Sequence, residues 1–172
     1  MTQPPCVGTV DADVRELRAA DHLLLELAAE LGLPEDAFGC THLVRGERPR
    51  VVLSFATTTR TAFEETARRL AAKGYEVTAG APDGVGRAVV YPGASALTGT
   101  VTIAELLARS AIGRVVVLGA PGEPPPSQPV VTRDHVRPQW QDGELVLTLM
   151  PAVGGVLVPF EVPDPTPCCA DH

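Results

Sequence analysis

Residues 43–120 alternate between short apolar runs and longer amphipathic stretches. The apolar runs are rich in β-branched residues, which is typical of strands, and cover 51–55, 75–79, 87–91 and 115–118. Each amphipathic stretch opens with a Thr-x-x-Glu capping box, at Thr61 or Thr102, and ends at a glycine, Gly74 or Gly113. The pattern therefore predicts the order β-α-β-β-α-β.

This order favours one α+β architecture. Two right-handed crossovers joined by a hairpin at Pro82-Asp83-Gly84 predict a ferredoxin-like split βαββαβ sheet with its helices on one face. A small doubly wound sheet is the alternative. Its dinucleotide fingerprint is missing, because Gly84-Val85-Gly86 opens a strand and not a helix.

Elements are also predicted on both sides of this core. Apolar residues at helical spacing predict an N-terminal helix over 13–31, with Asp13 and Glu16 as a capping box. Leucines widen its apolar face, so we expect burial against the sheet and a homodimer through this helix. Asp142-Gly143 predicts a hairpin turn within a C-terminal β extension over 130–162. We expect a single α+β domain over 1–163 and a cysteine-rich tail over 164–172.

The charge of the chain is unevenly distributed. The net charge of −7 over 172 residues makes nucleic acid an unlikely partner. Residues 44–74 are nevertheless basic, with seven cations, which are Arg45, Arg48, Arg50, Arg60, Arg68, Arg69 and Lys73. This stretch either packs near the acidic N-terminal helix of its own fold or forms a docking surface for an acidic protein partner.

The first residues carry neither a basic start nor an apolar run, and no stretch approaches the roughly 18 apolar residues of a membrane span. We therefore expect a cytoplasmic protein without membrane contact. Cysteines stay reduced in that compartment and bind metals or do redox chemistry more often than they form structural disulfides.

The C-terminal tail carries the most distinctive chemistry. Cys168 and Cys169 are adjacent, and His172 ends the chain. Thiolate and imidazole are ligands that zinc and copper(I) prefer, and vicinal thiols can present two sulfurs to one ion. The run Cys168-Cys169-Ala170 resembles the C-terminal tail of mercuric reductases, in which paired cysteines pass on mercury(II). The resemblance covers three residues and implies only the chemistry of a thiol pair.

A second thiol and imidazole lie two residues apart, at Cys40 and His42. If the tail folds back to this point, Cys40, His42, Cys168 and Cys169 complete a four-coordinate zinc site. Cys6 and His172 are substitutes for members of this set.

Two hydroxyl-rich loops follow the predicted strands at 51–55 and 87–91. If these strands are parallel neighbours, both loops and two helix N-termini meet at one sheet edge. This predicts a site for a small anionic ligand, phosphate or carboxylate, formed by Thr57, Thr58, Thr59, Arg60, Ser95, Thr98 and Thr100. The alternative is that these hydroxyls only cap helices, because neither loop has the lysine of a phosphate loop.

Sequence motifs of hydrolases, zinc peptidases and nucleotide-binding loops are missing. Our leading hypothesis is a non-enzymatic cytoplasmic binding or regulatory module whose vicinal-thiol tail holds or senses a soft metal ion, zinc or copper(I). The first alternative is an adaptor or inhibitor that uses the basic 44–74 surface and has an inert tail. The second is a thiol-dependent enzyme, or a modified precursor peptide, that acts through Cys168-Cys169.

Overall fold

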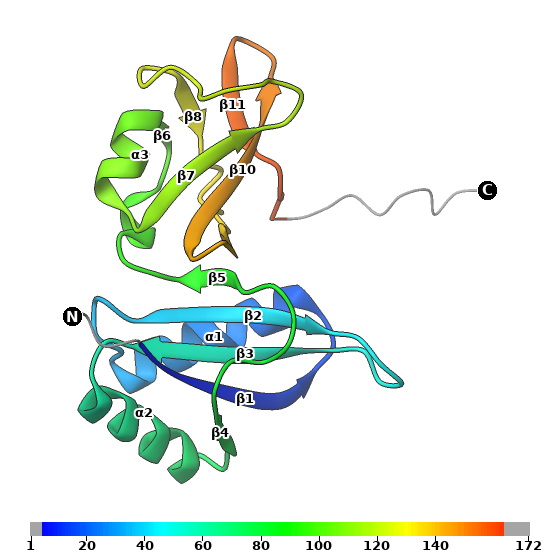
Figure 1. The fold of residues 1–172 in the computed structure, drawn as a ribbon, viewed down its shortest axis with the longest axis vertical. Helices are drawn as coiled ribbons and strands as arrows, with labels where there is room; N and C mark the ends of the chain where they lie inside the picture. Colours follow the sequence, from blue (N-terminus) through cyan, green and yellow to red (C-terminus); the bar gives the residue numbers. More distant parts are fainter. Residues whose placement is uncertain (1–4, 164–172) are drawn as a thin grey trace.

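The computed structural model describes residues 5–163, which form three α-helices and a mixed sheet of eleven strands (Figure 1). The elements follow the chain as β1 (Cys6–Val14), α1 (Leu17–Leu31), β2 (Phe38–Val44), β3 (Arg50–Thr57), α2 (Arg60–Ala72), β4 (Val77–Ala79), β5 (Arg87–Val90), the 3-10 turn η1 (Ala94–Ala96), β6 (Thr100–Thr102), α3 (Ile103–Arg109), β7 (Ile112–Val117), β8 (Pro129–Val131), β9 (Gln139–Gln141), β10 (Glu144–Ala152) and β11 (Val156–Pro159).

The strands lie in the order β4-β1-β3-β2-β5-β9-β10-β11-β8-β6, and β7 pairs with β10 outside this path. The predicted ferredoxin-like sheet over 43–120 is therefore wrong. The elements from β1 to β4 do follow one another as β-α-β-β-α-β, but they span 6–79 and supply only four of the eleven strands.

The prediction failed at the connection between β4 and β5. The Pro82-Asp83-Gly84 turn does not join them as a hairpin, because β1, β3 and β2 lie between them in the sheet. Residues 80–86 instead cross the face of these strands (Figure 1), and we call them the crossing segment. A turn signal fixes a local change of direction but does not fix which strands pair.

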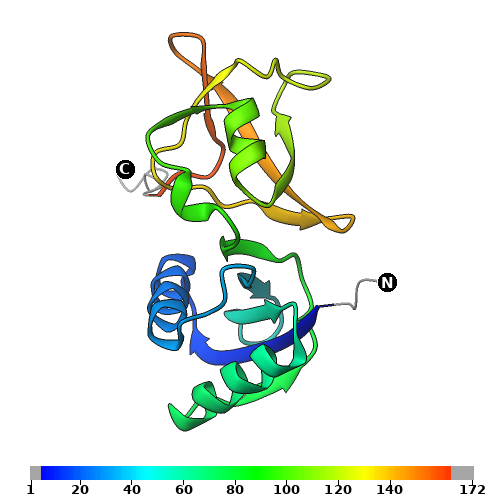
Figure 2. The ribbon, with the colours of Figure 1, turned by 90° about the vertical axis from the view of Figure 1, so that its left-hand side faces the viewer.

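The first half of the molecule, β1 to β5, packs both of its helices on one face of the sheet. Gly8 and Gly39 lie on either side of Phe55 in register. A Cβ at Gly8 would contact Phe63 of α2, and one at Gly39 would contact Leu24 of α1. Small residues at these two positions therefore let both helices approach the strands closely, and Figure 2 shows α1 and α2 together in this half.

The predicted helix over 13–31 begins later than expected. Residues 6–14 form β1, whose pairing with β3 shifts between Val10 and Val14, and Asp13 has a φ of 54°. The N-cap of α1 is Glu16, which makes no side-chain capping bond. The buried leucines of α1 enter the core of this half, whereas Leu25 is 46% exposed. The homodimer through this helix stays a prediction.

The second half, β6 to β11, is built around β10. β7 runs parallel to it, while β9 and β11 pair with it antiparallel. The predicted turn at Asp142-Gly143 is confirmed between β9 and β10, with φ values of 50° and 85°. Leu145, Leu147 and Leu149 of β10 alternate into a second hydrophobic core.

The two halves meet along β5 and β9. Arg87 and Gln139 are the only register pair of these strands, and Ala88 N–H donates to Pro138 O at 2.8 Å. Across the same junction, the rings of Phe38 and Trp140 lie 5.2 Å apart. Within residues 5–163, the chain passes from one half to the other once, between β5 and η1 (Figures 1 and 2).

Candidate ligand-binding hollow at the junction

Arg87 on β5 is the centre of an ion network that joins the two halves. Its guanidinium makes two hydrogen bonds to Asp21 of α1, at 2.5 and 2.9 Å, and donates to Thr41 Oγ1 of β2 at 3.0 Å. From the other half, Glu161 accepts from Nε of Arg87 at 2.8 Å and also from its NH2 group. These five contacts use the five N–H donors of an arginine side chain.

Two further residues extend the network. Arg137 Nε donates to Asp21 Oδ2 at 3.0 Å, and His135 Nε2 lies 3.0 Å from Glu161 Oε1. Arg87 and Asp21 have side-chain exposures of only 8% and 9%, whereas Glu161 is 35% exposed. Two arginines and two carboxylates therefore balance one another at a site that is largely removed from water.

The network fixes the protonation of its carboxylates. Burial alone would raise the pKa of Asp21, but hydrogen bonds from Arg87 and Arg137 hold this pKa below its ordinary value. Burial likewise opposes ionisation of Glu161, and Arg87 and His135 lower its pKa. The pKa of Arg87 is raised, because Glu161 and Asp21 outweigh the desolvation that burial imposes. The cluster therefore holds ionised groups.

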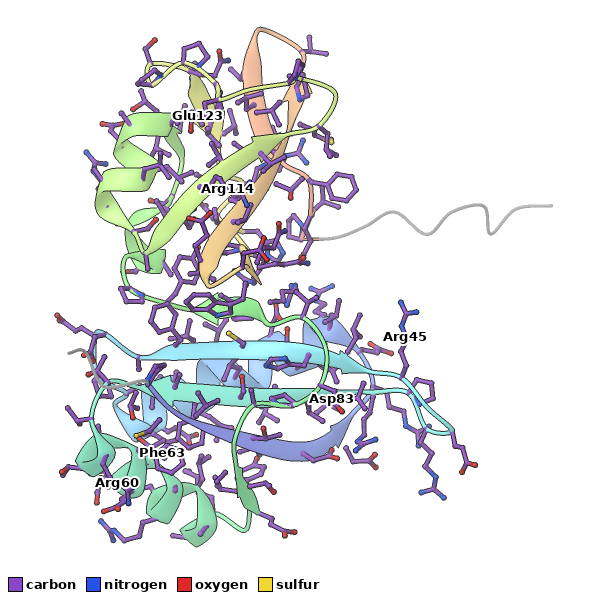
Figure 3. All side chains as sticks on the ribbon, viewed as in Figure 1. Arg45, Arg60, Phe63, Asp83, Arg114 and Glu123 are labelled. Carbon is purple, nitrogen blue, oxygen red and sulfur yellow. The ribbon has the colours of Figure 1, made fainter. Side chains whose placement is uncertain are left out.

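A hollow of about 590 Å³ opens beside this network. Much of its wall is apolar and comes from Leu17, Leu43, Val44 and Val85. Arg87 and Glu161 also line it. Figure 3 labels two further charged residues of its lining, Arg45 beyond the end of β2 and Asp83 on the crossing segment. An apolar wall with a few placed charges is the usual composition of a small-molecule site.

The predicted metal ligands Cys40 and His42 lie on the face of the sheet that is turned away from α1 and the Arg87 network. Thr41, between them, faces Arg87, so its two neighbours point away from α1. Both are about 5% exposed, beneath the crossing segment. A Cβ at Gly86 would lie 3.0 Å from the Trp140 ring and 3.2 Å from the His42 ring.

This cluster is electrically neutral. Burial raises the pKa of the Cys40 thiol to about 11, although Trp140 and Ser54 oppose the shift. Burial lowers the pKa of His42, and the Gly84 backbone opposes this. His42 Nε2 lies 2.6 Å from Ser54 Oγ, while its Nδ1 is buried without a hydrogen-bond partner of acceptable geometry among residues 5–163. The protonated, buried thiol is a poor nucleophile, and it would have to lose its proton before it could bind a metal.

The other predicted metal ligands, Cys168, Cys169 and His172, lie outside the described residues. Within 5–163, no three His, Cys, Asp or Glu side chains gather as a metal site would require. Glu161, two residues before the last described residue, forms an ion pair with Arg87. Glu161 therefore lies on the α1 side of the sheet, away from Cys40 and His42.

The geometric reason for the predicted anion site is missing, because β2 separates β3 from β5, and β5 is followed by the 3-10 turn η1 and then β6, not by an α-helix. Thr57 donates to Thr59 O at 3.0 Å, Thr58 donates to Asp36 at 2.6 Å, and Thr59 is the N-cap of α2. Arg60 lies 3.9 Å from Glu64 on the exposed surface of α2 (Figure 3). Ser95, Thr98 and Thr100 are exposed residues around η1 and the start of β6.

Most of the basic 44–74 stretch is paired within the chain. Arg50 bonds Asp11 at 2.5 Å, Lys73 bonds Glu30 of α1, and both Arg68 and Arg69 bond Glu65. Arg69 also donates to Leu31 O at the end of α1. These contacts agree with the interpretation that the stretch packs near its own N-terminal helix.

Sequence patterns did not identify Asp21, Arg87, Arg137 or Glu161 as site residues. Bonded partners among them are far apart in the sequence, as much as 116 positions for Asp21 and Arg137. One signal was nevertheless present. Asp21 interrupts the apolar face of a helix, and Arg87 opens a strand of otherwise apolar residues. A charged side chain at a position predicted to be buried needs a partner of opposite charge. Each of these two positions therefore indicated that such a partner lies elsewhere in the chain.

None of the helices described between residues 5 and 163 has the length and apolar character of a membrane span. Comparisons of the chain with models of protein families, with curated proteins and with solved structures find no match.

Proposed function

We propose that the protein is a non-enzymatic binding or regulatory module whose C-terminal thiols, Cys168 and Cys169, hold or sense a soft metal ion, zinc or copper(I), with His172 as a further ligand. In a reducing cytoplasm both thiols would remain available to the ion. The observation that carries the proposal is this vicinal thiol pair on a segment that follows the anchored Glu161.

The environment of Cys40 supports this choice, because it makes that thiol a poor metal ligand. Cys40 is buried, and its raised pKa keeps the thiol protonated near neutral pH. Its neighbour His42 is also buried, beneath Gly86 of the crossing segment. We therefore propose that the tail binds its ion without Cys40 and His42, with solvent completing the coordination.

The same observations weaken an enzyme that acts through Cys40, since a catalytic cysteine needs a stabilised thiolate. The adaptor hypothesis loses support for a different reason. Arg50, Arg68, Arg69 and Lys73 already contact carboxylates of their own chain, which leaves less free positive charge for an acidic partner.

Elemental analysis of the untagged protein, purified under reducing conditions, tests the proposal. We expect near-stoichiometric zinc or copper in the wild-type protein, and its loss in a Cys168→Ser/Cys169→Ser variant. The matched control is Cys6→Ser, which removes a partly exposed thiol elsewhere and should keep the metal.

Two results would contradict the proposal. One is a metal-free wild-type protein that does not bind added zinc or copper(I) tightly. The other is metal retained in the double variant, which would place the ligands outside the vicinal pair.

A further inference from the structure

The two carboxylates of Arg87 are held in unequal ways. Asp21 belongs to a helix, is 9% exposed, and is also bound by Arg137. Glu161 follows β11, lies outside any helix or strand, and is 35% exposed. Asp21 is therefore held in place by the fold. Glu161, in contrast, could give up its contact with Arg87 to another anion without disturbing a helix or a strand.

The geometry of the Glu161 contact is that of ligand recognition. Glu161 meets the Nε and NH2 groups of Arg87, which form the planar fork that binds a carboxylate in bidentate fashion. The same two residues line the hollow. A carboxylate that entered the hollow would meet this fork if Glu161 moved aside.

The charge balance favours such an exchange. With Glu161 in place, two arginines face two carboxylates. Without it, Arg87 and Arg137 face Asp21 alone, so one positive charge is left unpaired at a buried position. Because an uncompensated buried charge is costly, the vacated fork would bind another anion strongly.

We propose that Arg87 is the recognition residue of a binding site for small organic acids, and that Glu161 is an internal competitor that fills the site when no ligand is bound. The ligand carboxylate takes the Nε and NH2 groups of Arg87. Its apolar body lies along Leu17, Leu43 and Val85. The lining indicates the class of ligand. Displacement of Glu161 leaves one unpaired positive charge beside apolar walls, which suits a monocarboxylate better than a phosphate.

Octanoate is the test probe, and octanamide is the uncharged control of the same length. Binding is measured by two-dimensional NMR, in which the signals of Gln139 and Arg87, both lining residues of the hollow, report the ligand. Metal-free Cys168→Ser/Cys169→Ser protein is the parent, so that the outcome does not depend on metal binding by the tail.

We expect Glu161→Gln in this parent to bind octanoate at least tenfold more tightly than the parent does, and at least tenfold more tightly than it binds octanamide. Leu43→Glu should weaken octanoate binding relative to the uncharged Leu43→Gln, because it places a carboxylate in the wall.

Equal affinity for octanoate and octanamide in Glu161→Gln would overturn the proposal, as would affinity no tighter than that of the parent. If Glu161→Gln does not fold, Glu161→Asp takes its place. Its shorter side chain reaches Arg87 less well, so octanoate binding must still tighten. No tightening there also rejects the site.

Discussion

At the scale of single residues, two glycines show how differently the same backbone conformation can be constrained. Gly93 has a φ of 82° and Gly99 a φ of 61°, both in the left-handed region. A Cβ at Gly93 would lie 1.9 Å from the carbonyl oxygen of Arg109, whereas a Cβ at Gly99 would meet nothing within 4 Å. Gly93 is therefore required by packing as well as by conformation.

Gly93→Ala should destabilise the protein by more than about 3 kcal/mol, because the backbone at the end of α3 must move away from the new methyl group. Gly99→Ala, the matched control, carries only the left-handed backbone cost of about 1–2 kcal/mol. Urea unfolding of both variants measures the difference. Equal losses would show that the close approach to Arg109 is not a constraint.

At the scale of elements, capping signals were predicted with mixed success. Thr102 and Glu105 form the predicted capping box of α3. The boxes predicted at Thr61 and Asp13 are wrong: α2 is capped by Thr59, and Asp13 lies in β1. A Thr-x-x-Glu or Asp-x-x-Glu spacing indicates that a helix begins nearby, but a competing strand or an earlier threonine can displace the boundary.

Strand pairing is the part of the fold that local pattern could not predict. The four strands that the pattern located over 43–120 exist as β3, β4, β5 and β7, and the predicted hairpin turn joins β9 to β10. The order β4-β1-β3-β2-β5 depends on contacts between distant segments, such as Val10 with Leu53. For the same reason the Arg87 cluster was missed, since its four charged members Asp21, Arg87, Arg137 and Glu161 are far apart in the sequence.

The crossing segment gives a prediction at this scale, because it covers Cys40. In a variant that keeps Cys40 as its only cysteine, we expect alkylation by iodoacetamide at pH 8 to be at least about a hundredfold slower than for a thiol of ordinary pKa. The raised pKa of about 11 leaves little thiolate, and burial blocks access.

A variant that keeps Cys6 alone is the control for this experiment, since Cys6 is partly exposed. Mass spectrometry follows both reactions, and mild urea should accelerate the Cys40 reaction. Equal native rates for the two thiols would show that the crossing segment does not protect Cys40.

At the scale of the whole molecule, the Arg87 network makes stability depend on pH. The pKa values of Asp21 and Glu161 are lower in the folded state than their ordinary values near 4. Their contribution is therefore complete above about pH 5 and is lost as the pH falls through the lowered folded-state values. The sign is that of acid destabilisation.

Asp21→Asn should reduce the free energy of unfolding at pH 7 by about 3–5 kcal/mol, because it leaves Arg87 and Arg137 with one carboxylate between them. It should also flatten the acid dependence. Asp11→Asn breaks the exposed pair with Arg50 and should cost less than about 1 kcal/mol. Urea unfolding between pH 2 and pH 7 distinguishes these outcomes, and equal losses in the two variants would contradict a structural role for the network.

The single passage of the chain between its halves has a consequence for how the molecule can move. Each half has its own hydrophobic core, although Cys40 and Ala88 of the first half join the core of the second. The junction therefore resembles an interface between two subunits, with a short sheet contact, a ring pair and paired charges. Release of Glu161 from Arg87 would remove one ion pair between the two halves and leave both hydrophobic cores intact.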